Sequence, residues 1–145
     1  MKKILSSLII AASLVFSLTS CEKVEMGGAD LKTLSLSYDL DGNTLPTIPS
    51  EGQVITKAVV INQGGVNRDV EWEVSVDNAP SWVKVEKTTV QNHFNGTYGG
   101  DDCDITLKGV TITVDANDSG AKRSAVIRYT VADGSSISTM LTQSK

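Results

Sequence analysis

The sequence predicts an all-β protein, an antiparallel β-sandwich of about seven short strands. Apolar and polar residues alternate with a period of two in several separate segments, which is typical of strands that bury one face. A cluster of Asp, Asn, Gly or Pro stands at almost every junction between these segments, and such clusters favour tight turns. Beyond residue 20, no segment has the apolar spacing of a helix.

The segment 70–85 holds both tryptophans and the clearest alternation. Apolar side chains occupy every second position and polar ones the positions between, namely Val70, Trp72, Val74 and Val76 against Glu71, Glu73, Ser75 and Asp77. The DNAP sequence of residues 77–80 then predicts a turn, after which a second strand begins at Trp82. We expect Trp72 in the core because it alternates in phase with valines. Trp82 could lie in the core or form an exposed platform for a sugar, and both placements stay open because Val83 beside it is also apolar.

Two further strands are expected before this segment. Residues 34–40, LSLSYDL, alternate and are followed by an Asp-Gly-Asn turn. The next segment contains Pro46 and Pro49, and proline has no amide hydrogen to donate, so it cannot form a central strand. Residues 53–62 are rich in β-branched residues and apolar on both faces in their second half, which indicates a central strand.

The second half of the chain begins with an irregular stretch, residues 91–104, which we expect to be a long loop of the functional or the disordered kind. Strands are expected over residues 105–114, with a bulge at Lys108 and Gly109, and over residues 123–131 and 137–143. Turns are expected at residues 115–120 and at the Asp-Gly pair that follows Ala132. The resulting plan is that of an immunoglobulin-like antiparallel β-sandwich of about seven strands.

The N-terminus has the layout of a bacterial lipoprotein signal peptide. Lys2 and Lys3 precede a mostly apolar stretch, and residues 18–21, LTSC, match a lipobox, in which cleavage precedes a lipidated cysteine. We therefore divide the chain into a signal peptide (1–20), a tether that begins at lipidated Cys21 (21–33) and a sandwich domain (34–145). Two alternatives are an ordinary signal peptide with an incidental cysteine and an uncleaved membrane helix, although the apolar run is short for a span.

If this anchor is present, we expect the protein at a bacterial outer membrane. Glu22 and Glu25 partly resemble the export signals that send lipoproteins of the Bacteroides group to the cell surface, but Lys23 interrupts them. The cell-surface and periplasmic faces of the membrane therefore both stay open. The acyl chains on Cys21 would hold the protein to the lipid.

Charge and cysteine content exclude some classes of partner. The chain has 13 basic and 17 acidic residues, and removal of Lys2 and Lys3 with the signal peptide leaves a formal charge of −6. The basic residues are scattered apart from Lys122 and Arg123, so we expect no nucleic acid partner. If Cys21 is acylated, Cys103 has no disulfide partner within the chain. We expect it to be a small buried residue, with a reactive thiol or an intermolecular disulfide partner as the alternatives.

Several motifs in this order resemble the BACON domain, a Bacteroidetes-associated family. They are residues 80–85 (PSWVKV), residues 111–114 (TITV) with Asn117, residues 123–127 (RSAVI), and a last strand that ends in Thr142 and Gln143. The resemblance covers most of residues 34–143. It implies a small immunoglobulin-like sandwich from gut bacteria, a role in binding carbohydrate or mucin glycans, or a plain spacer role. We expect a departure from the family's usual setting, in which an enzyme domain accompanies the sandwich, and the loop 91–104 is longer than the family core requires.

The sequence contains no motif of a hydrolase, and we expect no enzyme activity and no cofactor. The single histidine, His93, has no nucleophile motif beside it. Glycan binding needs aromatic rings for stacking and paired donors and acceptors for hydroxyl groups. The loop 91–104 offers both, so the candidate ligand-binding residues are Asn92, His93, Phe94, Asn95, Tyr98, Asp101 and Asp102. In the alternative, Phe94 and Tyr98 plug one end of the sandwich.

We expect no metal site. Asp101, Asp102 and Asp104 form the one local carboxylate cluster that hard cations would favour. Residues 115–120 match the first half of an EF-hand loop, but the twelfth position is Val126 in place of a glutamate. An Asx-rich turn explains this second match better.

Two functional hypotheses follow. The first is a lipid-anchored, non-catalytic module that binds glycans or mucin at the bacterial cell envelope through loop 91–104. The second is a structural or assembly lipoprotein, a spacer or a domain that docks another envelope protein on an exposed strand edge.

Overall fold

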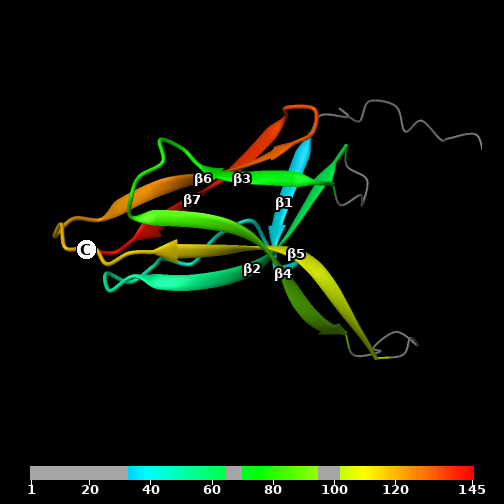
Figure 1. The fold of residues 1–145 in the computed structure, drawn as a ribbon, viewed down its shortest axis with the longest axis horizontal. Coiled ribbons are helices and arrows are strands. Elements are labelled where there is room, and N and C mark those ends of the chain that lie inside the picture. The colour runs from blue at the N-terminus through cyan, green and yellow to red at the C-terminus, as the bar shows by residue number, and fades with distance from the viewer. Residues whose placement is uncertain (1–32, 65–69, 95–101) are drawn as a thin grey trace, which may run out of the picture.

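A computed structural model describes residues 33–64, 70–94 and 102–145 and confirms the all-β prediction (Figure 1). The described residues form no helix and seven strands: β1 (Leu34–Tyr38), β2 (Gln53–Gln63), β3 (Trp72–Val76), β4 (Val83–Phe94), β5 (Cys103–Val114), β6 (Arg123–Val131) and β7 (Ser136–Gln143). Accordingly, nothing among these residues is a helix that could cross a membrane.

The strands form two antiparallel sheets that pack as a β-sandwich. One sheet has the order β1-β2-β5-β4 and the other the order β3-β6-β7. Strands β1 and β4 are therefore the edges of the first sheet, and β3 and β7 are the edges of the second.

The core lies between the sheets and is centred on Trp72 of β3 and Tyr129 of β6. Both side chains are fully buried, and their rings meet edge to face with 5.2 Å between centroids. The prediction that Trp72 is a core residue is thus confirmed. Aliphatic side chains from both sheets complete the core, among them Ile48, Val59, Ile61, Val110, Ile112, Ile127 and Leu141.

A hydrogen bond between two buried tyrosines joins the sheets. The hydroxyl groups of Tyr38 on β1 and Tyr129 on β6 are 2.9 Å apart. Burial raises the pKa of Tyr129 to about 12 and raises the pKa of Tyr38 still further, because a phenolate would have to leave water. Both phenols therefore stay neutral at physiological pH.

The end of the sandwich that carries the C-terminus contains a network of polar side chains. Gln143 is completely buried and donates from Nε2 to the carbonyl groups of Pro49 and Asp115, at 3.0 and 2.9 Å. Asn117, also buried, donates to the carbonyls of Ala121 and Ser144. Its Oδ1 accepts from the backbone N–H of Ser119, which makes the segment 115–120 an Asx turn, as predicted.

Strand β2 changes its partner in the middle of the sheet. It pairs with β5 as far as Ala58, opposite Gly109, and then pairs with β1 from Val59 onward. A Cβ atom at Gly109 would lie 2.9 Å from the carbonyl oxygen of Lys57, so the chains cross closely at this point. From Lys108 back to Cys103, β5 pairs with β4 alone among the strands that the structure describes.

Three sequence predictions in this region are wrong. The stretch 91–104 was expected to be a loop, but its first and last residues belong to strands. Strand β4 continues to Phe94, β5 begins at Cys103, and Phe94 pairs with Cys103. No bulge occurs at Lys108 and Gly109, since the register is continuous there. Cys103 is exposed and not buried, because it lies at the far end of this hairpin.

Candidate functional site

The extended ends of β4 and β5 form a two-stranded ribbon, residues 88–94 and 103–108, which we call the arm. It continues β4 and β5 past the point at which β2 leaves the sheet. Figure 1 shows the arm projecting from the sandwich, away from the end that carries the C-terminus. A projecting ribbon presents both faces and both edges to its surroundings, so its side chains are accessible to a ligand.

The apolar face of the β4–β5 ribbon reverses at Gly109. In the sandwich, Val83, Val114 and Ile112 face the core, while Lys84 and Glu86 face outward. In the arm, the strand face that continues from the core carries polar residues, and the opposite face carries Val90, Ile105 and Leu107. The face of the β4–β5 ribbon that is apolar in the sandwich is therefore polar in the arm, and the opposite face is apolar there.

The polar face of the arm is a ladder of cross-strand hydrogen bonds. Gln91 and Thr106 stand opposite each other and share two, at 2.8 and 3.1 Å. One step further, His93 Nδ1 lies 2.7 Å from Asp104 Oδ1, with side-chain exposures of 55% and 77%. Donors and acceptors thus lie on paired strands and still face water.

The other face of the arm is largely apolar. Val90, Ile105 and Leu107 are half-buried, and Asn92 lies among them opposite Ile105. At the end of this face, Cys103 carries an exposed free thiol. The two faces therefore offer different chemistry, hydrogen bonding on one and apolar contact on the other.

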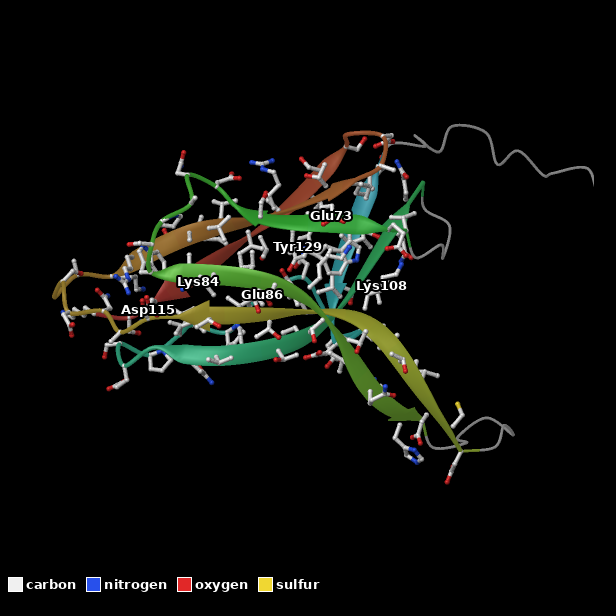
Figure 2. All side chains as sticks on the ribbon, viewed as in Figure 1. Glu73, Lys84, Glu86, Lys108, Asp115 and Tyr129 are labelled. Carbon is white, nitrogen blue, oxygen red and sulfur yellow. The ribbon has the colours of Figure 1, made fainter. Side chains whose placement is uncertain are left out.

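Two lysines fix the root of the arm to the neighbouring sheet. Lys108 forms an ion pair with Glu71 at 3.0 Å, and this contact lowers the pKa of the Glu71 carboxyl group. Lys87 forms an ion pair with Glu73, also at 3.0 Å, and its ammonium group lies 5.3 Å from the centroid of the Trp72 ring. Figure 2 shows Glu73 on β3 and Lys108 between that strand and the base of the arm. The two lysines thus link the base of the arm to β3 and to the residue just before it.

The structure brings together only part of the predicted site. Asn92 and His93 lie on opposite faces of β4, and Asp102 is exposed immediately before β5. Phe94 ends β4, but its side chain lies outside what the structure describes, as do Asn95, Tyr98, Asp101 and the lipidation candidate Cys21. Asp104 pairs with His93. Within the described residues, no group of three metal-ligating side chains occurs.

Sequence reasoning missed the residues that make the two faces of the arm. Gln91 and Thr106 were not predicted as a pair, and Ile105 and Leu107 were assigned to an ordinary sheet strand. The alternation of Val90 with Gln91 before residues 95–101, and of Leu107 with Thr106 after them, is the sequence signal of two paired strands.

A second surface is a groove between the sheets, beside the edge strands β3 and β4. It has a volume of about 500 Å³ and is lined by Ser75, Val76, Ala79, Pro80, Ser81, Val83, Lys84, Val85 and Glu86. Its charged residues are one lysine and one glutamate, and valines line its apolar part.

The fold defines an all-β sandwich with a projecting hairpin arm. No family model matches the chain, and no curated protein matches it. Among solved structures, it is similar to a Bacteroides ovatus GH5 xyloglucanase in complex with a XXXG heptasaccharide, with 22% identity and a TM-score of 0.47. The match covers 76% of this chain and 19% of the xyloglucanase chain, so this chain spans about a fifth of the length of that protein.

Proposed function

We propose that the protein is a lipid-anchored, non-catalytic module of the bacterial cell envelope that binds glycans through the arm. The observation that carries this proposal is the exposed ladder of Gln91, Thr106, His93 and Asp104. Sugar hydroxyl groups both donate and accept, and this ladder offers amide, hydroxyl, imidazole and carboxylate groups on one strand face.

The arm supplies what a glycan requires besides hydrogen bonds. A binding site for sugars needs a fixed geometry, and the paired strands hold the polar side chains at regular intervals of two residues. Phe94 and Tyr98, which follow His93 in the sequence, are the rings proposed to stack on sugar C–H faces. The acylated Cys21 and the tether 21–33 would present the arm to ligands at the membrane surface.

A glycan array tests the proposal with the full chain extracted in detergent. Binding to a glycan or mucin, weakened about fivefold to tenfold by Gln91→Ala, His93→Ala, Phe94→Ala or Tyr98→Ala, is the expected result. Gln53→Ala is the matched control, since Gln53 is an exposed glutamine on β2 remote in sequence and sheet position from the arm. Absence of binding to any mucin or plant glycan, or equal loss in the control, would contradict it.

A second candidate function is that of a structural or assembly lipoprotein. The observation that favours it is the apolar face of the arm, because Val90, Ile105 and Leu107 suit a protein surface better than a sugar. In that case a pull-down from the native envelope recovers a stoichiometric protein partner, and Leu107→Ser abolishes its capture while His93→Ala does not. The opposite pattern of sensitivity favours the glycan.

A further inference from the structure

The edge of β4 carries backbone groups without partners in the sandwich. Asp115 donates its backbone N–H to the carbonyl of Trp82, at 2.9 Å, so the backbone groups of Trp82 point toward the chain of β5. Along β4, those of every second residue after Trp82, Lys84 and Glu86 among them, do the same. By the alternation of an antiparallel ladder, the N–H and C=O of Val85 point away from β5. Within the described residues they form no hydrogen bond. Val85 is therefore ready to pair with an added strand.

The groove lies directly beside this edge. Val76, Val83 and Val85 contribute apolar side chains to its lining, and residues 79–81 also line it. Val85 is only partly buried although it packs against the core. A strand added to β4 would thus find the N–H and C=O of Val85 free and apolar side chains beside them, whereas the N–H of Val83 is already donated to the carbonyl of Pro80.

The charges that flank Val85 indicate which strand fits. Lys84 and Glu86 are exposed on the outer face of β4, and neither forms an ion pair among the residues that the structure describes. Figure 2 shows both on the part of β4 that belongs to the sandwich. One lysine and one glutamate, two residues apart, are self-complementary when a strand pairs with its own antiparallel copy.

We propose that two copies of this chain associate through β4, antiparallel, about a twofold axis at Val85. In this register Lys84 stands opposite Glu86 of the second copy, and Glu86 opposite Lys84 of the second copy. Val85 meets Val85 of the second copy as a hydrogen-bonded pair that uses the free backbone groups of both. An axis at Lys84, Glu86 or Lys87 would instead place like charges opposite each other, which is unfavourable.

The dimer would join the two β1-β2-β5-β4 sheets into one continuous sheet, an isologous interface in which each copy contributes the same strand. Because the two β4 strands run in opposite directions, the arms would extend at opposite ends of the joined sheet. The interface is separate from the arm, so this inference does not depend on what the arm binds.

A charge-reversal series tests the pairing by sedimentation equilibrium of the full chain in density-matched detergent. Lys84→Glu and Glu86→Lys should each weaken the dimer about tenfold, because each turns two attractive pairs into two repulsive ones. The double variant Lys84→Glu/Glu86→Lys should restore association. All substituted side chains are exposed, so folding is preserved. A parent chain that stays monomeric up to about 1 mM, or a dimer that none of the variants changes, overturns the proposal.

Disulfide trapping tests the register. Lys84 and Glu86 of the second copy would form a non-hydrogen-bonded pair with Cα atoms about 4.5 Å apart, within disulfide range. Two tagged chains, one with Lys84→Cys and one with Glu86→Cys, both also Cys103→Ser, should cross-link on oxidation in the membrane of co-expressing cells. Each variant alone should cross-link little, because identical positions lie on a diagonal about 7 to 8 Å apart. Equal cross-linking of a single variant with itself refutes this register.

Discussion

Arg123 lies over the ring of Trp82, with 4.2 Å between the guanidinium carbon and the ring centroid. The same side chain donates from Nε to Oε1 of the buried Gln143 at 2.8 Å, and from Nη2 to the carbonyls of Asp115 and Ala116. The guanidinium thus joins the start of β6, the end of β7 and the turn after β5. Trp82, Arg123 and Gln143 therefore form one connected group at the end of the sandwich remote from the arm.

This arrangement predicts that Arg123→Lys destabilises the protein although it keeps the charge. An ammonium group cannot replace the planar fork that serves three acceptors and the aromatic face at once. The buried Oε1 of Gln143 would lose its donor, so we expect a loss of about 2 kcal/mol in the free energy of unfolding, measured by urea denaturation. Lys122→Ala, at the exposed neighbouring residue, is the control and should change stability by less than about 0.5 kcal/mol. Equal stability of Arg123→Lys and the parent would show that the network contributes little.

The sequence predicts strands well where both ends carry a turn signal. Residues 123–131 are β6 as expected, because DANDSG precedes them and an Asp-Gly pair follows. Trp72 could be placed in the core from its phase with the valines. Ile48 is fully buried although it belongs to no expected strand. This burial could not be predicted, because its backbone N–H donates to the carbonyl of Thr142, which is remote in the sequence.

The arm and the groove could not be predicted, because both depend on long-range pairing. The polar residues between Val90 and Ile105 resemble a loop until β4 and β5 are placed in register. The reversal of the apolar face at Gly109 also follows from that register. The free edge of β4 follows from the strand order, which alternation along one strand does not determine.

The crossing of β2 and β5 predicts that Gly109→Ala is destabilising. A Cβ atom there would lie 2.9 Å from the carbonyl oxygen of Lys57 and 2.8 Å from Cγ2 of Val90. The valine can rotate, but the carbonyl is part of the sheet, so we expect a loss of about 1 to 3 kcal/mol in urea denaturation. The control is Gly42→Ala, whose Cβ would meet nothing within 4 Å. If both alanine variants are as stable as the parent, the crossing is not tightly packed.

Two isoleucines of β5, one in the arm and one in the core, allow the contribution of each part to stability to be measured separately. Ile112 is completely buried between the sheets, whereas Ile105 is half-buried on the arm. Ile112→Ala removes well-packed methyl groups and should cost about 2 to 5 kcal/mol. Ile105→Ala should cost less than about 1 kcal/mol, because the arm contributes little to the core. Thermal denaturation of the two variants measures the difference, and comparable losses would mean that the arm folds as part of the core.

The tyrosine pair predicts that stability falls in alkaline solution. The pKa of Tyr129 is raised from 10 to about 12 by burial, and that of Tyr38 is raised as well, so the folded state binds their protons more tightly than the unfolded state does. This contribution is fully present below pH 10 and is lost as the pH rises through the folded-state pKa of about 12. For Tyr129 alone, the difference between its ordinary pKa of 10 and its folded-state pKa of about 12 corresponds to a loss of about 3 kcal/mol in the free energy of unfolding.

Urea denaturation at a series of pH values from 8 to 11 measures this dependence, and the variant Tyr129→Phe isolates it from the titration of lysines. The variant should lose about 1 kcal/mol at pH 8, because the hydrogen bond between the two hydroxyl groups is removed. Its stability should then decline less steeply than that of the parent, since one proton fewer is released on unfolding. Parallel declines in the two proteins would mean that Tyr129 titrates in the folded state as an ordinary exposed phenol, which its complete burial between the sheets opposes.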